Sequence, residues 1–191
     1  YNELLEKHGS SLMGLGWKSA NQQFLRFQKL IDFIPQEKMS INDLGCGFGD
    51  LYGFLKTMGY NDYLYRGYDI TPKMILISEA NCNEKNAKFS LIQSSQELVK
   101  ADFTVASGIF NGKMDVEKKC WVEYILNTLH DMNKNSSKGF SFNILTSYSD
   151  KECMRKDLFY GEPYFFFNYC KMNFSKYVNL LHDYDLYEFT I

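Results

Sequence analysis

The sequence predicts an α/β fold: a doubly wound, mostly parallel sheet with helices on both faces. Three observations support this prediction. Short apolar segments alternate with segments of helical periodicity, and a glycine-rich turn joins the first such pair. The chain has 191 residues, of which 45% are hydrophobic, enough for one domain with a large core. In such folds a ligand binds beyond the carboxyl ends of the strands.

The first predicted element is a helix over residues 19–34, where apolar side chains recur on one face at helical spacing. Ser19 with Gln22 has the pattern of a capping box at its start, and Pro35 stops it. We expect a single domain, with residues 1–35 as an N-terminal helical cap and residues 36–191 as the α/β core.

The remaining elements are expected to alternate along the chain. Strands are predicted at residues 39–44, 63–68, 87–92, 103–106 and 139–145, followed by a closing strand pair at 177–181 and 186–191. Helices are predicted at residues 51–58, from 72 onward, and at 116–132 and 163–172. Thr71 and Pro72 open the second of these, as N-cap and first helical residue.

Composition and charge exclude several classes of function. The formal net charge is −2, so there is no basic excess to neutralise a nucleic-acid backbone. No apolar run is long enough to span a bilayer, and residues 1–9 lack an apolar signal core. The five cysteines are odd in number and form no C-x-x-C pair, which disfavours disulfides and a metal site. We therefore expect a cytoplasmic protein, monomeric or homodimeric, without nucleic acid, membrane insertion or metal.

The sharpest motif is the segment DLGCGFG at residues 43–49, which leaves the first predicted strand and enters a helix. Its alternate glycines allow a tight turn and close approach of a ligand to the backbone. A dinucleotide fingerprint, G-x-G-x-x-G, would place its third glycine at position 50, where this chain has Asp50. An acid there opposes a pyrophosphate at the helix N-terminus, which argues against NAD. A plain glycine turn without a ligand is the less favoured alternative.

A second signal is Asp69, at the end of the second predicted strand and 20 residues after Gly49. An acid about 20 residues beyond such a turn reaches ribose hydroxyls. The alternative, an acid at a helix N-terminus, is less favoured because the glycine segment precedes it.

Together, these residues resemble the first two motifs of the class I S-adenosylmethionine-dependent methyltransferases. Asp43 and the glycines at 45, 47 and 49 match the first motif, and Asp69 matches the second. The resemblance extends from the first predicted strand to the closing pair. It implies a Rossmann-like, seven-stranded sheet with the last strand antiparallel, S-adenosylmethionine as cofactor and S-adenosylhomocysteine as product.

The resemblance also implies roles for individual residues. Gly45 and Gly47 would lie against the methionine part of the cofactor, and Asp43 would orient its amino group. Asp69 would hold the ribose and Ile70 would pack on the adenine ring.

After the third strand the family often has an Asp or Asn that binds the adenine amine. This chain has Gln93-Ser94-Ser95 there. We expect Ser94 or Ser95 either to supply a weaker hydroxyl contact or to cap the turn that follows.

Within the family, the chain resembles small bacterial methyltransferases of surface (capsular) polysaccharide biosynthesis. The similarity rests on GWKS at residues 16–19 with Arg26-Phe27, on ASGIFN at 106–111 and on LHDY at 181–184. It implies that Trp17 and Arg26 close over the methionine end, with Arg26 pairing the carboxylate. A core aromatic and a solvated helix charge are equally favoured alternatives for these two residues.

Candidate residues for the acceptor side follow the later strands. Residues 107–111 end the fourth predicted strand and face the crevice, so Ser107 is expected at the cofactor and Asn111 either at the acceptor or in a turn. Tyr148 follows the fifth strand, and His182 ends a late strand. His182 is the most plausible general base because imidazole titrates near neutrality, although a lone histidine is more often structural. The adjacent His130 and Asp131 are interpreted as a helix surface feature.

The expected reaction is methyl transfer to a small-molecule acceptor, with catalysis mainly by alignment because the leaving thioether is neutral. The leading hypothesis is O-methylation of a small sugar or a phosphate- or phosphoramidate-type precursor of a surface polysaccharide. The alternatives are a nicotinamide-dependent oxidoreductase and a non-catalytic cofactor-binding domain.

Overall fold

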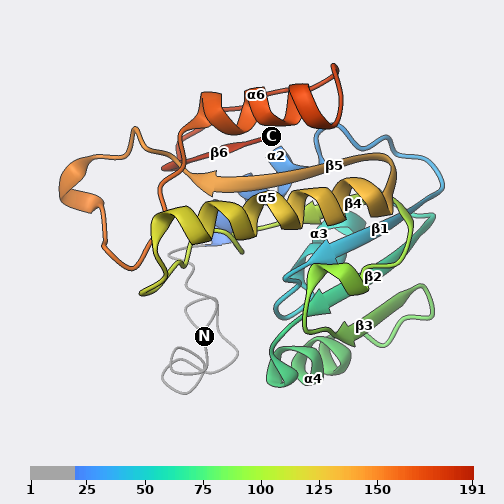
Figure 1. Ribbon diagram of the computed structural model, residues 1–191. Helices are drawn as coiled ribbons and strands as arrows, with labels where there is room; N and C mark the ends of the chain where they lie inside the picture. Colours follow the sequence, from blue (N-terminus) through green and yellow to red (C-terminus); the bar gives the residue numbers. More distant parts are fainter. Residues whose placement is uncertain (1–19) are drawn as a thin grey trace.

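The structure is a computed structural model that describes residues 20–191 (Figure 1). Its centre is a six-stranded sheet with the order β3-β2-β1-β4-β5-β6. The strands are β1 (Met39–Leu44), β2 (Tyr63–Asp69), β3 (Ala87–Leu91), β4 (Ala101–Ala106), β5 (Ser136–Leu145) and β6 (Glu188–Thr190). All neighbouring pairs are parallel except β5 and β6, which are antiparallel. The doubly wound, mostly parallel sheet predicted from the sequence is thereby confirmed.

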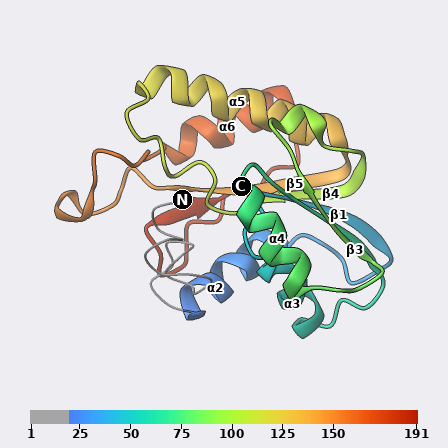
Figure 2. The ribbon, with the colours of Figure 1, turned by 90° about the horizontal axis from the view of Figure 1, so that it is seen from below.

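Helices cover both faces of this sheet. They are α2 (Ala20–Ile31), α3 (Asp50–Thr57), α4 (Pro72–Asn81), α5 (Lys118–Asn135) and α6 (Pro163–Asn173), with short 3₁₀ turns η2 (Ser95–Glu97) and η3 (Lys151–Cys153). Figure 2 shows α5 and α6 on one side of the sheet and α2, α3 and α4 on the other. Each face has its own apolar cluster, around Leu30 and Leu55 on the α2–α3 side and around Leu129 and Phe166 on the α5–α6 side.

The topological switch point lies between β1 and β4. The chain leaves β1 outward to β2 and β3, then returns to β4 on the other side of β1. Leu44 is the register partner of Ala106, so the next residues, Gly45 and Ser107, leave the sheet beside each other. This is the crevice in which open α/β sheets bind their ligands.

Local signals in the sequence explain two of the helix boundaries. At the end of α3, Gly59 adopts φ = 88°, Gly59 N–H donates to the Lys56 carbonyl and Tyr60 N–H donates to the Leu55 carbonyl. These two bonds form a Schellman motif, which requires a left-handed residue. Helix α4 begins at Pro72, as predicted, with Thr71 in the N-cap position.

The structure differs from the sequence-based expectation in the number of strands and in the ends of several elements. The described residues form six strands rather than seven, because segment 177–181 contributes only an isolated antiparallel bridge between Leu181 and Thr190. Strand β6 has three residues and offers little edge for a further strand. Helix α2 ends at Ile31, where a tighter turn follows, and β5 begins at Ser136, directly after α5. The expected capping box at Ser19 lies outside the described residues.

Within residues 20–191, no helix is long and apolar enough to cross a membrane. The same part of the chain contains no group of three or more His, Cys, Asp or Glu side chains placed to hold a metal ion.

Candidate active site

The bend after β1 is built from three left-handed glycines. Gly45, Gly47 and Gly49 have φ angles of 78°, 54° and 81°, a region that side chains with a Cβ rarely adopt. Gly45 N–H and Cys46 N–H both donate to the Tyr68 carbonyl oxygen, at 2.7 and 2.9 Å. The end of β2 therefore fixes the path of the bend.

Gly45 is required for a second reason. An ideal Cβ on Gly45 would lie 2.1 Å from Ile109 Cγ2. The loop after β4 thus packs directly on the bend after β1, and no larger residue fits at position 45.

Asp69 joins the glycine bend to the start of α4. Its Oδ2 accepts a hydrogen bond from Gly47 N–H at 3.1 Å, and its Oδ1 accepts one from Thr71 N–H at 2.8 Å. Burial raises the pKa of Asp69, while these backbone N–H groups oppose the rise. Ile70, the next residue, is 70% exposed, so its apolar side chain is available to a flat ligand surface.

Asp43 is buried beneath the bend. Its Oδ2 accepts a hydrogen bond from the hydroxyl of Tyr65, with an O···O distance of 2.5 Å. The pKa of Asp43 is raised to about 7, mainly by burial; the Tyr65 hydroxyl opposes the rise, and the nearby charges of Asp69 and Asp50 add to it. Three acidic side chains, Asp43, Asp50 and Asp69, therefore lie near the glycine bend, and a bound cation would favour the ionised form of each.

Ser107 has a buried hydroxyl oxygen that finds no hydrogen-bond partner among the described residues. It follows β4 directly, beside Gly45 across the sheet register. An unpaired buried hydroxyl costs on the order of 1–3 kcal/mol, so Ser107 is a candidate for a ligand contact, and its place at the cofactor stays a prediction.

Asn111 ties the loop after β4 to β5. Its Oδ1 accepts a hydrogen bond from Leu145 N–H at 3.1 Å, and its backbone carbonyl accepts one from Phe159 N–H at 2.8 Å. Its Nδ2 has no partner among residues 20–191. The turn-stabilising alternative is therefore present, and an acceptor contact through Nδ2 stays a prediction.

The structure brings the other two predicted acceptor-side residues together. The ring centroids of Tyr148 and His182 lie 5.9 Å apart, and both side chains are exposed. His182 also lies edge-on to Phe189, at 6.2 Å. Their roles in chemistry stay predictions.

Arg26 forms a buried ion pair that the sequence did not suggest. Its Nε donates to Glu188 Oε1 at 2.6 Å, and its Nη2 lies 2.5 Å from Glu188 Oε2. Asn143 Nδ2 also donates to Glu188 Oε1, and Asn143 Oδ1 accepts from Gly108 N–H. This chain of contacts runs from α2 through β6 and β5 to the loop after β4. The pairing of Arg26 with a cofactor carboxylate stays a prediction, and Trp17 lies outside the described residues.

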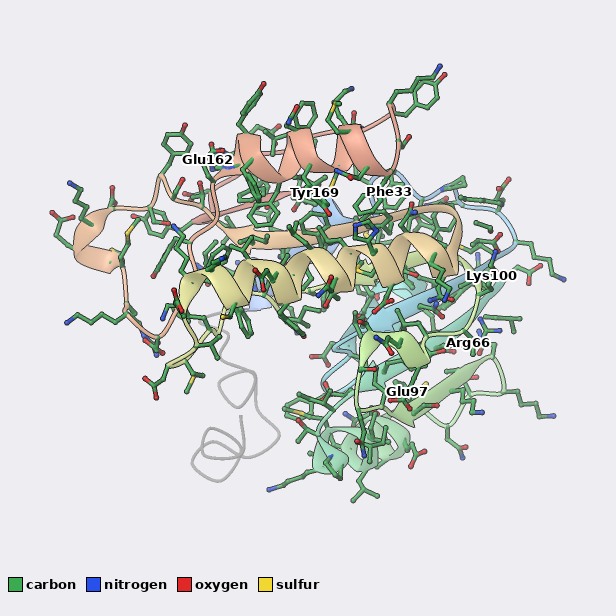
Figure 3. The ribbon with its side chains drawn as sticks, viewed as in Figure 1. Phe33, Arg66, Glu97, Lys100, Glu162 and Tyr169 are labelled. Atoms are coloured by element: carbon green, nitrogen blue, oxygen red, sulfur yellow. The ribbon has the colours of Figure 1, made fainter. Side chains whose placement is uncertain are left out.

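Two other features agree with the sequence-based expectations: the turn after β3 is capped, and His130 makes a structural contact. Glu97 accepts hydrogen bonds from the backbone N–H groups of Gln93 and Ser94, at 2.6 and 3.1 Å, and so caps the turn after β3 (Figure 3). His130 Nε2 lies 2.8 Å from the Tyr169 hydroxyl on α6, so this imidazole is occupied by a structural contact. A role for Ser94 at the adenine ring stays a prediction.

Comparison with known proteins gives a relative and a shared fold. No family model matches the chain. A Mycobacterium tuberculosis protein named "Putative methyltransferase Rv1506c" is 44% identical over 155 residues, which cover 81% of this chain and 92% of that protein.

Two solved structures share the architecture at 13% identity, which is informative for the fold alone. The structure of magnesium protoporphyrin IX methyltransferase from Synechocystis, with bound S-adenosylhomocysteine, has a TM-score of 0.63 to this chain. The matched region covers 92% of this chain and 87% of the Synechocystis chain. A methyltransferase from Aquifex aeolicus described as S-adenosylmethionine-dependent has a TM-score of 0.59, with 91% and 97% covered.

Proposed function

This chain belongs to the S-adenosylmethionine-dependent methyltransferases, and on that premise we propose that the glycine bend holds the cofactor and that the carboxyl ends of β4 and β5 hold the methyl acceptor. The observation that carries the proposal is the set of three acidic side chains, Asp43, Asp50 and Asp69, near the bend, whose ionised form a bound cation would favour. S-adenosylmethionine brings a sulfonium and an ammonium to this site. A nicotinamide dinucleotide would bring a doubly negative pyrophosphate, so the oxidoreductase alternative is not favoured.

The residues around the bend fit the cofactor in the following way. Gly45 and Gly47 lie against its methionine part, and the buried carboxylate of Asp43 orients its ammonium group. The unpaired hydroxyl of Ser107 gains a polar partner there. Asp69 holds the ribose hydroxyls with the lone pairs that its two backbone bonds leave free, and the exposed Ile70 packs on the adenine ring.

The N-terminal part completes the cofactor site in this proposal. Arg26 and Trp17 close over the methionine end, with Glu188 fixing the orientation of the Arg26 guanidinium. Ser94 supplies a hydroxyl near the adenine. We regard the whole chain as one methyltransferase domain, with residues 1–35 as its cap.

When bound, the cofactor supplies an electrophilic methyl group and leaves as neutral S-adenosylhomocysteine. The protein's task is therefore alignment, together with removal of a proton where the acceptor is a hydroxyl. His182, held beside Tyr148, is the base we propose, and Asn111 Nδ2 donates to the acceptor.

The acceptor that we propose is a small sugar or a phosphate- or phosphoramidate-type precursor of a surface polysaccharide, methylated on oxygen in the cytoplasm by a monomer or homodimer. The sequence similarity of segments 16–19, 106–111 and 181–184 supports this choice. A non-catalytic cofactor-binding domain is the alternative, and it would bind the cofactor without transferring its methyl group.

Calorimetry with a matched pair of variants tests the cofactor site. S-adenosylmethionine should raise the melting temperature and NAD should not, because only a ligand that binds the native state stabilises it. Asp69→Ala removes charge-assisted hydrogen bonds to two ribose hydroxyls and should raise the Kd roughly 10- to 100-fold. Asp62→Ala, at an exposed position one residue before β2, should leave the Kd unchanged. An unchanged affinity in Asp69→Ala would contradict the assignment.

Transfer of a labelled methyl group to a panel of sugars and sugar phosphates tests the activity. His182→Gln should lower the turnover rate without altering the cofactor Kd. Cofactor binding without transfer to any oxygen acceptor would favour the non-catalytic alternative.

A further inference from the structure

A cavity of about 310 Å³ lies at the carboxyl ends of β4 and β5, separate from the residues of the glycine bend. Met154, Leu158 and Phe159 form its apolar wall. Lys113, Lys118, Ser147 and Tyr160 contribute polar groups to its lining. Its volume is that of a small-molecule pocket.

Backbone hydrogen bonds hold the walls of this cavity in place. Met114 N–H donates to the Asp157 carbonyl at 2.9 Å, and Gly112 forms an antiparallel bridge with Leu158. On the other side, Ser147 N–H donates to the Gly161 carbonyl at 2.8 Å. Segment 154–161 is therefore fixed between the loop after β4 and the end of β5. In Figure 1 this orange segment lies at the edge toward which the strand arrows of β1, β2 and β5 point.

Two of the seven lining residues, Lys113 and Lys118, are lysines. Lys113 Nζ donates to the carbonyls of Met114 and Val116, at 3.0 and 3.4 Å, and has no ion-pair partner among residues 20–191. The Lys118 ammonium has no hydrogen-bond or ion-pair partner in the described part of the chain.

The carboxylate whose field reaches Lys113 is Asp157, and it is already engaged. Arg155 Nε and Nη2 bind its two oxygens at 3.0 and 2.5 Å. Between residues 20 and 191, no carboxylate forms an ion pair with Lys113 or Lys118. The two lysines therefore add positive charge to the lining of the cavity.

One loop connects this cavity to the proposed cofactor site. It starts at Ser107, packs Ile109 against Gly45 and reaches the cavity at Lys113, six residues after Ser107. On the opposite wall, Ser147 is followed by Tyr148, which contacts His182. The cavity is thus connected along the chain to the glycine bend on one side and to the proposed base on the other.

We infer that this cavity binds the methyl acceptor, and that the acceptor carries an anionic group, a phosphate or a carboxylate, held between Lys113 and Lys118. The body of the acceptor packs on Phe159, and its hydroxyls reach the free Ser147 hydroxyl and Tyr160. This inference rests on the proposed function and narrows its acceptor to an anion.

Binding of simple anions to the protein saturated with S-adenosylhomocysteine tests the inference. Phenyl phosphate and benzoate are the anionic probes, and benzyl alcohol is the neutral one. Lys118→Gln should weaken the anionic probes about fivefold, and the Lys113→Gln, Lys118→Gln double variant by more than about tenfold. Benzyl alcohol should bind all variants alike.

The matched control is Lys119→Gln, which removes the same charge from the next residue of α5, outside the lining of the cavity. Equal affinity of the anions for Lys118→Gln and the wild type, or an equal loss in Lys119→Gln, would overturn the inference. Lys118 makes no described contact, so its variant should fold normally. The Kd of S-adenosylmethionine, measured in parallel, separates the two proposals: cofactor binding without lysine-dependent anion binding refutes only this one, whereas absence of cofactor binding refutes the proposed function.

Discussion

Two ion pairs hold α2 against the C-terminal segment, and they differ in burial. Arg26 pairs with Glu188, and the two side chains are 12% and 0% exposed. Lys29 pairs with Asp183 at 2.9 Å, and the carboxylate of this pair is 72% exposed. The buried pair therefore tests how much burial adds to the stability contributed by an ion pair, and the exposed pair between the same two segments is its control.

The expected loss for Glu188→Gln follows from this burial. Glutamine keeps the shape of the side chain but removes its charge, and its NH2 group would face either Arg26 or Asn143, both of which are donors. A buried ion that loses its partner costs about 3–5 kcal/mol. For a chain of this length each kcal/mol lowers the melting temperature by about 2–4 °C, so a fall on the order of 10 °C is expected. Asp183→Asn should change it little, because exposed pairs contribute little.

Urea unfolding followed by circular dichroism measures both effects. The midpoint should fall for Glu188→Gln with an unchanged m-value, which would indicate a stability loss alone. Salt should reduce the small effect of Asp183→Asn and leave that of Glu188→Gln. The Arg26→Met, Glu188→Met double variant should recover much of the loss, because neither charge is then buried alone. Equal losses in Glu188→Gln and Asp183→Asn would refute the reasoning.

Two further predictions concern the glycine bend and the carboxylate beneath it. Gly45→Ala should destabilise the protein, because the added Cβ would lie 2.1 Å from Ile109 Cγ2 and the residue would have φ = 78°. Gly53→Ala lies in helix α3, where an added Cβ would meet no atom within 4 Å, and it should raise the free energy of unfolding by about 0.5–1 kcal/mol. The melting temperatures of the two variants should therefore shift in opposite directions. The pKa of Asp43 is about 7 in the folded protein and 3.8 in the unfolded chain. Between these values the folded protein holds a proton that the unfolded chain has released, so the bound proton stabilises the fold. This stabilisation should be lost as the pH rises from about 4 to 7. Urea unfolding across this range should show a flatter pH profile for Asp43→Asn, and an equally steep profile would contradict the buried, protonated state.

The parts of the fold that could be predicted from the sequence are those whose signals are local. Strand β1 with the glycines after it, the Thr71-Pro72 helix start and the position of Asp69 each depend on residues close together in the chain. Glycine spacing reports backbone geometry directly, because only certain φ angles permit the bend.

The parts that could not be predicted depend on distant pairings. Arg26 and Glu188 are 162 residues apart, and Glu188 lies in a short apolar segment that predicts a strand without indicating its partner. A charged residue within such a segment is a signal that a buried partner exists. Tyr65 is a similar case: its place in β2 predicts a core aromatic, and only the fold brings its hydroxyl to Asp43.

The charges at the two ends of the loop after β4 are opposite in sign, and this has a consequence for how two ligands would share the crevice. In the proposed cofactor site, the buried Asp43 and the half-buried Asp69 would attract the cationic cofactor. At the cavity, the exposed Lys118 would attract the anionic acceptor that we infer. Salt screens exposed charges over about 10 Å at 0.1 M and buried charges much less. Rising ionic strength should therefore weaken acceptor binding more steeply than cofactor binding. The charge of Lys118 is exposed to solvent and is screened by salt, whereas Asp43 and Asp69 are at least partly surrounded by protein and are screened less.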